Sequence, residues 1–509
     1  MLSNHVYNIV NEVLDHQKFQ HDEDIVLQSF NTSVFAMTTA LLSGCAGIAP
    51  NTQWDARVEP AAYAKAIAPF EHGDSRRTSV FADQPGASAW EGDGITVCKA
   101  PDHLAGAYTM VVDAEGDIYV LEGVAPAEGI SGAGVTKVDG KTLETIWRAA
   151  IEPTRRSWTY PGALALHGNG DLYAVTGVTA ARIATDTGDV LVRQDLPDGG
   201  YPDDATYNGL LLMANGYILA KSLYRVPGCE SDGFHAFLDC GTATELGSML
   251  LLLEPEGLDP AWSGPAPERI GGRVTSVERD GAERVYMPGA DGLHRWIHTD
   301  GKLKADPEWP VQDYTRPGER PGAAAAVFGD YVVIQTNARL TEAPYRIVAI
   351  HQDAPEIRHE ALPFADLSPQ RAFIPSKPTA DWANKRVYVV DAFGGTAALD
   401  FDETDGFSTA WRSPSRSFNF TTILGPADDR LLAHSKIEPE DADVSAMRYG
   451  GDRIVLRRAA TGEQLAITRA FPPGPGLTQL PGPDGSLVYA SISGDLYRIS
   501  PGDAPCPTE

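Results

Sequence analysis

Two acidic residues end short apolar runs in this chain, where a side chain could leave the core and meet a ligand. Glu122 closes the run Ile-Tyr-Val-Leu-Glu, and Asp391 closes Val-Tyr-Val-Val-Asp. Carboxylate oxygens are ligands that Ca²⁺ takes in proteins, and a carboxylate can also act as a general base. The pattern therefore predicts a role for Glu122 and Asp391 in binding Ca²⁺ or in catalysis. The alternative is that both are polar strand ends that meet solvent.

Three further polar residues lie in segments expected to line the centre of the fold. They are Asn208 in Tyr-Asn-Gly-Leu, Lys377 in Pro-Ser-Lys-Pro and Asn419 in Phe-Asn-Phe. A lysine is rarely buried unless it is paired. Lys377 is therefore expected either to neutralise Asp391 or to bind the ligand, and it is the third catalytic candidate.

The basic residues are mostly arginine, and many of them fall in loops that would join one group of strands to the next. Of 41 basic residues 30 are arginine, in a chain whose formal net charge is −28. This charge argues against a nucleic-acid partner, because phosphate binding needs a basic face. Guanidinium groups gathered on one face of an acidic protein would instead attract an anionic small molecule. The predicted ligand-binding residues are Asn208, Arg273, Arg316, Arg371, Arg416, Asn419 and Trp158. The alternative is that these arginines are solvated and pair with nearby acids.

The elements that would position these residues belong to a repeat. A turn and a short alternating strand are followed by a second strand, an Asp-x-x-Gly type of turn and a strand that closes on tryptophan. The first strand recurs eight times between Ile118 and Leu487, at a mean spacing of about 53 residues. Units of this length with four short strands are typical of a β-propeller blade. We therefore expect an all-β protein with an eight-bladed propeller over residues 94–506. A β-sandwich or a β-solenoid is the alternative.

The last repeat lacks its final strand, and the strand-like segment 94–99 precedes the first repeat. We expect this N-terminal strand to complete the last blade, which would bring Cys98 near Cys506. Cys229 and Cys240 fall in one long loop of the third unit. The sequence therefore predicts the disulfides Cys98–Cys506 and Cys229–Cys240, and with them an oxidising envelope or extracellular compartment. The alternative is a cytosolic protein with reduced, buried cysteines.

The N-terminal region shows no core pattern until a short apolar run that ends in Leu-Ser-Gly-Cys45. This ending resembles the lipobox of bacterial lipoproteins, which implies lipidation at Cys45 and a lipid anchor as the contact with a membrane. The alternative is a coincidental match, because the acidic residues before the run are unlike a signal peptide. Residues 1–45 are expected to be a signal-like segment and residues 46–93 a linker or a wrap.

The repeats themselves resemble those of quinoprotein alcohol dehydrogenase-like propellers. The resemblance rests on Gly-Asp-Ile-Tyr-Val at 116–120 and Val-Asp-Gly-Lys-Thr-Leu-Glu-Thr-Ile-Trp-Arg at 138–148, and it covers roughly residues 95–500. It implies an oxidoreductase that holds pyrroloquinoline quinone over Ca²⁺, or a non-catalytic lipoprotein scaffold of outer-membrane assembly that binds a protein partner. The chain has no adjacent cysteine pair and no Cys-x-x-Cys-His haem site.

The run Tyr-Asn-Gly-Leu is similar to the metal strand of gluconolactonase-type propellers. This second resemblance adds Asn208 to Glu122 and Asp391 as a metal ligand, and it implies a Ca²⁺-dependent lactonase or esterase. Three functions are thus expected: an envelope protein that binds and transforms an anionic organic molecule, a scaffold, or a binding module for sensing or transport.

Overall fold

The structure is a computed structural model, and it describes residues 62–92, 94–123, 132–152, 158, 160–231, 233, 235–317, 319–337, 346–366, 376–442, 444, 450–474, 479–503 and 505–506. Chain contacts divide the protein into two units, residues 1–51 and 52–509. All described residues belong to the second unit. Cys45 and Arg371 lie outside the described residues, so their predicted roles stay predictions.

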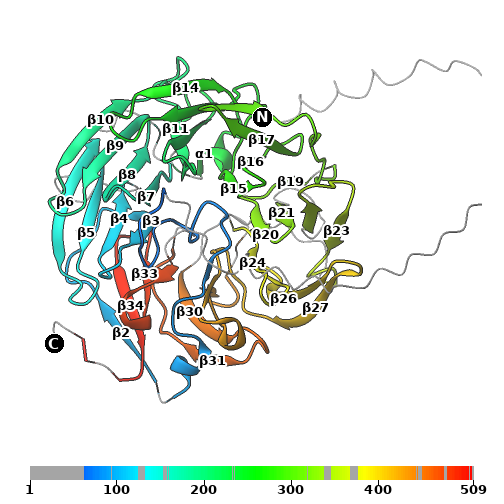
Figure 1. The fold of residues 1–509 in the computed structure, drawn as a ribbon. Helices are drawn as coiled ribbons and strands as arrows, with labels where there is room; N and C mark the ends of the chain where they lie inside the picture. Colours follow the sequence, from blue (N-terminus) through cyan, green and yellow to red (C-terminus); the bar gives the residue numbers. More distant parts are fainter. Residues whose placement is uncertain are drawn as a thin grey trace, which may run out of the picture. The chain divides into compact units, whose positions relative to one another are not determined.

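The described residues form eight sheets arranged as the blades of a propeller (Figure 1), which confirms the predicted fold. Each blade is an antiparallel meander that begins at the central channel and ends at the rim. Blade 1 consists of β3 (Ala107–Val112), β4 (Ile118–Glu122), β5 (Ala133–Val138) and β6 (Thr145–Glu152), and blade 2 of β7 (Ala163–Leu166), β8 (Asp171–Thr176), β9 (Thr179–Ala184) and β10 (Val190–Asp195). Blade 3 consists of β11 (Ala205–Leu212), β12 (Ile218–Tyr224), β13 (Met249–Leu253) and β14 (Pro260–Pro265), and blade 4 of β15 (Thr275–Arg279), β16 (Ala282–Pro288), β17 (Leu293–Thr299) and β18 (Lys302–Ala305).

Blade 5 has an innermost strand in two pieces, and blade 8 takes its outermost strand from the N-terminal side of the ring. Blade 5 consists of β19 (Arg320–Pro321), β20 (Ala326–Phe328), β21 (Tyr331–Asn337), β22 (Ile347–His351) and β23 (Arg358–Ala361), and blade 6 of β24 (Thr379–Asp381), β25 (Arg386–Asp391), β26 (Gly395–Asp402) and β27 (Gly406–Ser413). Blade 7 consists of β28 (Thr422–Leu424), β29 (Leu431–Glu438), β30 (Gly451–Arg458) and β31 (Gln464–Ile467), and blade 8 of β32 (Gln479–Pro481), β33 (Leu487–Ala490), β34 (Leu496–Pro501) and β2 (Ile95–Lys99).

The few helices in the described residues are short: α1 (His235–Asp239) and the 3₁₀ turns η2 (Ala87–Trp90), η3 (Ala427–Asp429) and η4 (Pro483–Gly485). None of them is long and apolar enough to cross a membrane.

The ring closes as the sequence predicts. Strand β2 pairs antiparallel with β34, with Cys98 opposite Arg498. The Cys98–Cys506 disulfide joins this strand to the C-terminal residues, with Cα atoms 5.4 Å apart and a sequence separation of 408. A covalent bond therefore holds together the two segments that close the ring.

Burial follows the position of each strand within its blade. The second strand is covered on both faces by the neighbouring blades, so β12 is buried along its whole length. The outermost strand β10 instead alternates between half-buried and exposed side chains. This is why the second strands read as continuous apolar runs and could be aligned as a repeat.

The tryptophan that closes a repeat packs on the glycine turn of the next blade. A Cβ atom on Gly462 would lie 2.6 Å from the ring of Trp411 in blade 6, and one on Gly188 would lie 2.7 Å from Trp147 in blade 1. The indole of Trp411 also donates to the Ala459 carbonyl at 2.9 Å. The two sequence signatures of the repeat thus form one contact between successive blades.

Residues 62–81, which we call the channel segment, run inside the ring (Figure 1). The segment bonds to the innermost strands of seven blades by backbone hydrogen bonds or by a tyrosine hydroxyl, and it ends as β1 (Val80–Phe81), which pairs parallel with β28. Its contacts are Ala68 with Val112, Pro69 with Leu166, Tyr63 with Leu212, Ser75 with Ser276, Arg76 with Val327, Thr78 with Ala380 and Ser79 with Ile423. The described part of the predicted linker or wrap thus includes a segment inside the ring.

Candidate functional site

The channel segment carries a buried carboxylate that binds two arginines. Glu71 accepts hydrogen bonds from Nη1 of Arg77 at 2.6 Å and from Nε and Nη2 of Arg273 at 3.0 and 3.3 Å. Arg273 also donates to the carbonyls of Pro161 and Gly162. The side chains of Glu71 and Arg77 are fully buried, and that of Arg273 is 7% exposed. Arg273 was predicted to bind an anionic ligand, and in the structure it binds a carboxylate of its own chain.

Two lysines are buried without making an ion pair in the described residues. Lys377, a predicted catalytic residue, donates to Oγ of Ser79 at 2.9 Å and to the Pro378 carbonyl at 3.1 Å. Lys221 donates to Oδ1 of Asn208 at 2.5 Å and to a backbone carbonyl. Burial, reinforced by neighbouring arginines, lowers the pKa of both amines well below the usual value. Lys377 therefore contacts the channel segment and not Asp391.

The three predicted metal ligands lie in three different blades, and each has partners in its own surroundings. Glu122 accepts hydrogen bonds from the Ala105 amide and the Thr136 hydroxyl. Asn208 accepts from Lys221 and donates to the Gly271 carbonyl at 3.1 Å.

Asp391 accepts hydrogen bonds from the amides of Phe393 and Gly394 at 2.5 and 2.7 Å. Burial raises the pKa of this carboxyl, and the two amides oppose that shift. No group of three or more His, Cys, Asp or Glu side chains in the described part of the chain is arranged to hold a metal ion. No hydrogen bond links Glu122, Asn208 and Asp391 to one another in the described residues, and their role in binding Ca²⁺ stays a prediction.

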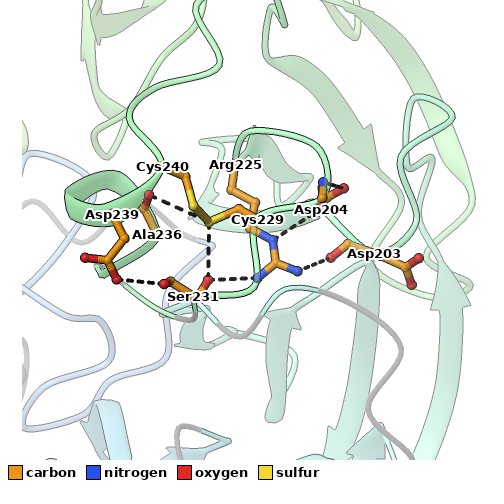
Figure 2. Close-up of a disulfide and its surroundings, with 9 residues drawn as sticks. Asp203, Asp204, Arg225, Cys229, Ser231, Ala236, Asp239 and Cys240 are labelled. Carbon is orange, nitrogen blue, oxygen red and sulfur yellow. Dashed lines mark hydrogen bonds and ion pairs between the residues drawn. A yellow bond between two sulfur atoms is a disulfide. The ribbon is translucent and has the colours of Figure 1, made fainter. Parts of the chain in front are cut away.

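The long loop of blade 3 is held by the second predicted disulfide, Cys229–Cys240 (Figure 2). Beside the disulfide, Arg225 donates to Oδ1 of Asp204 at 2.7 Å and to the carbonyls of Ser231 and Asp203. These bonds fix the loop onto the preceding blade junction.

Aromatic residues pack beneath this loop. Trp158, predicted to bind ligand, is buried with its ring centroid 4.7 Å from that of Tyr160 and 5.3 Å from that of Phe237 in α1. The guanidinium of Arg269 lies over the other side of this cluster, 5.2 Å from the Phe237 centroid. In the structure Trp158 is therefore part of an apolar cluster under the stapled loop.

A cavity of about 800 Å³ lies between blades 6 and 7. Four cationic side chains line it, together with one acid and two serines: Arg412, Arg416, Lys436, Arg457, Glu440, Ser413 and Ser415. We call this cavity the blade 6–7 groove. Phe393 and Gly394, whose amides bind Asp391, form part of its wall. Of the predicted ligand-binding residues, Arg416 lies in this groove.

Two of the guanidinium groups in the groove bind only neutral partners in the described residues. Arg416 donates to the carbonyls of Glu440 and Ala442. Arg457 donates to the hydroxyls of Ser413 and Ser415 at 2.7 and 2.9 Å. The other two cations have acidic partners, because Arg412 pairs with Asp366 and Lys436 with Glu440.

A histidine holds the inner end of Arg457. Nε of Arg457 donates to Nε2 of His434 at 3.1 Å, and Nδ1 of His434 donates to the Ser435 carbonyl at 2.7 Å. Burial and the adjacent guanidinium lower the pKa of His434 to about 3, so the ring stays neutral and can accept this bond. Neither residue was singled out from the sequence, since both lie within strands that otherwise read as core.

The remaining predicted residues lie elsewhere. Arg316 is 61% exposed and pairs with Glu360 at 2.9 Å. Asn419 is buried and donates to Oγ of Ser435 and to Oδ2 of Asp452, both at 3.0 Å. The predicted ligand-binding residues within the described part of the chain therefore do not form one site: Arg273 lies in the channel, Trp158 under the blade 3 loop and Arg416 in the blade 6–7 groove, while Arg316 is exposed and paired with Glu360.

No family model matches this chain, and no curated protein matches it in sequence. Solved structures similar to it include BamB from Moraxella catarrhalis, at 10% identity and a TM-score of 0.45 over 80% of this chain and 100% of that one. Quinohemoprotein alcohol dehydrogenase from Comamonas testosteroni is similar at 12% identity and a TM-score of 0.43 over 89% and 83% of the two chains. The Dos1 propeller is similar at 9% identity and a TM-score of 0.48 over 80% and 96%. The eight-bladed fold itself follows from the strand pairing.

Proposed function

We propose that this propeller binds an anionic small organic molecule in the blade 6–7 groove. The observation that carries the proposal is the gathering of four cationic side chains around one cavity in a chain of net charge −28. A cavity of about 800 Å³ is within the range that drug-sized ligands occupy. Because the rest of the protein is acidic, an anion has a lower electrostatic energy in this groove than over the surrounding surface.

Arg457 and the two serines that it contacts would bind the anionic group of the ligand in this proposed site. A buried guanidinium that has no carboxylate partner keeps an uncompensated charge, and the serine hydroxyls can rotate to donate to an incoming oxyanion. Arg416 and Lys436 line the same groove, while the side chain of Phe393 offers an apolar surface. These groups suit a ligand with a carboxylate or phosphate group attached to an apolar body.

The location we propose is an oxidising compartment such as the cell envelope. Two disulfides support it, because structural disulfides persist outside the reducing cytosol. Lipidation at Cys45 would add an anchor there. Oxidoreductase, lactonase and scaffold activities remain alternatives, and a ligand found in this groove would identify which chemistry to assay first.

Binding can be tested by calorimetry with citrate, benzoate and phenyl phosphate as probes. We expect at least one probe to bind with 1:1 stoichiometry, and Arg457→Gln to weaken it by about 10- to 100-fold, as loss of a charge-assisted hydrogen bond implies. Arg416→Gln tests the rim of the groove without disturbing a buried residue. Arg182→Gln, which removes an arginine paired with Asp171 and Glu256 in blade 2, is the matched control.

The proposal fails if no probe binds, or if a probe binds equally well to the wild type and to the Arg457→Gln and Arg416→Gln variants. Binding that Arg182→Gln weakens as strongly as Arg457→Gln would also count against the groove, because it would indicate a nonspecific effect of lost positive charge.

A further inference from the structure

Two buried nitrogens at the tip of the channel segment lack a hydrogen-bond partner in the described part of the chain. Nη2 of Arg77 and Nε2 of His72 are buried, and neither has a hydrogen-bond partner among the residues that the structure describes. Arg77 is fully buried and His72 is 5% exposed. A buried polar group without a partner costs about 1–3 kcal/mol, so such atoms in a native fold call for a group that satisfies them.

The protonation of His72 follows from its neighbours. Oγ of Ser79 accepts a hydrogen bond from Nζ of Lys377 at 2.9 Å and lies 3.3 Å from Nδ1 of His72. Because the serine proton is then free to point at Nδ1, that nitrogen accepts and Nε2 carries the proton. Burial, with the nearby charges of Lys377 and Arg77, lowers the pKa of His72, so the ring is neutral. The unsatisfied atom of His72 is therefore a donor, as is that of Arg77.

The charges around the tip do not balance either. Arg77 and Arg273 share one carboxylate, that of Glu71, and Lys377 has two neutral partners. The carboxylate of Asp74 is engaged by Arg76, at 2.7 Å from Nη2. A buried cation is tolerated when an anion lies beside it.

The backbone of the tip is held in a conformation that costs energy. His72, Arg77 and Ser79 all have positive φ, at 148°, 56° and 59°. Residues other than glycine rarely adopt this region, and such positions gather where a ligand is clamped. The three residues that carry or support the free donors are thus also the strained ones.

We propose that a small monovalent anion, of the size of chloride or formate, binds at the tip of the channel segment among Arg77, His72 and Lys377. It accepts hydrogen bonds from the free nitrogens of Arg77 and His72 and supplies the missing negative charge. The anion ties the tip to blade 6 through Lys377 and so stabilises the channel segment within the ring. This site is separate from the blade 6–7 groove and does not depend on the proposed function.

Crystals of the full chain in sodium bromide test the site directly, since bromide replaces chloride and scatters anomalously. We expect one anomalous peak within hydrogen-bond distance of Nη2 of Arg77. A water molecule or empty density at this position would overturn the proposal, because the donors would then be satisfied without an anion. Formate in the place of bromide, seen as a planar density on the same donors, would support the site and identify it as one for carboxylates as well.

Thermal unfolding in chloride and in gluconate at equal ionic strength tests the site in solution, because gluconate is too large to enter. We expect Tm of the wild type to rise by roughly 2 °C for each tenfold increase in chloride above its Kd. His72→Phe keeps the ring that packs on Phe420 at 4.4 Å but removes the donor. Lys377→Met keeps the apolar stem and removes the amine. Both variants should bind chloride at least about tenfold more weakly.

Lys385→Met is the control, because Lys385 is an exposed lysine that pairs with Glu403. Its response to chloride should equal that of the wild type. A chloride response that is the same in all four proteins would refute the site. If Lys377→Met does not fold, the bromide experiment on the wild type still decides the question.

Discussion

Glu71→Gln isolates the ion cluster that holds the channel segment in the ring. The substitution keeps the size of the side chain, but it leaves Arg77 and Arg273 buried without a carboxylate. Removing one member of a buried ion pair costs about 3–5 kcal/mol, because the remaining charge stays desolvated. Unfolding entropy is about 2.1 cal/mol/K per residue, so the roughly 450 residues of the propeller unit give about 0.9 kcal/mol/K. We therefore expect Tm to fall by about 3–5 °C.

Scanning calorimetry and tryptophan fluorescence can measure this change with the disulfides intact. The control is Glu403→Gln, which removes an acid from an exposed pair with Lys385 and should shift Tm by less than about 1 °C. If Glu71→Gln is as mild as Glu403→Gln, then Glu71 does not offset the charge of the arginines and the reasoning about the channel segment is wrong.

Other predictions concern the blade contacts, a buried histidine and the disulfides. Gly462→Ala should cost about 1–3 kcal/mol more than Gly281→Ala in denaturant unfolding, because both glycines have φ near +75° but only Gly462 meets a tryptophan ring. The pKa of His434 is depressed to about 3 in the folded protein. The stability that the neutral histidine contributes is therefore complete above pH 6.5 and is lost as the pH falls toward 3. His434→Gln should reduce the slope of unfolding free energy against pH by up to about 1.4 kcal/mol per pH unit in that window. Replacing both cysteines of the ring-closing disulfide by serine should lower the free energy of unfolding by about 6 kcal/mol through loop entropy. The same change in the blade 3 loop should lower it by about 3 kcal/mol. Equal losses of stability in calorimetry would contradict the entropic argument.

The ring and its closure could be predicted from the sequence because they rest on periodic patterns. Each second strand is covered by two neighbouring blades, so it reads as an apolar run that recurs at the repeat length. The last repeat lacked one strand, and 94–99 was a strand-like segment left over just before the first repeat. Two cysteines then fell on the two sides of the closing pair, which fixed the disulfide.

The candidate site was less predictable because its residues belong to no repeat. Arg416 was found from its place in a loop between blades, and the structure brings it to the groove. Arg457 and His434 alternate with core residues of β30 and β29, so their types looked incidental. What distinguishes Arg457 is the absence of a carboxylate partner in the described residues. The sequence does not predict this, because it does not show which side chains lie next to one another in the folded protein.

The channel segment shows most clearly why some structure leaves no pattern in the sequence. The innermost strands are arranged around an axis, so a segment that passes inside them meets each blade at one or two residues and forms no continuous ladder. Its side chains therefore have neither the period of a strand nor that of a helix. The backbone is satisfied by successive blades, and the charges that remain must be satisfied locally, as Glu71 does for Arg77 and Arg273. A dense group of charged residues without periodicity, Glu-His-Gly-Asp-Ser-Arg-Arg, is thus what a segment buried among the innermost strands of seven blades requires.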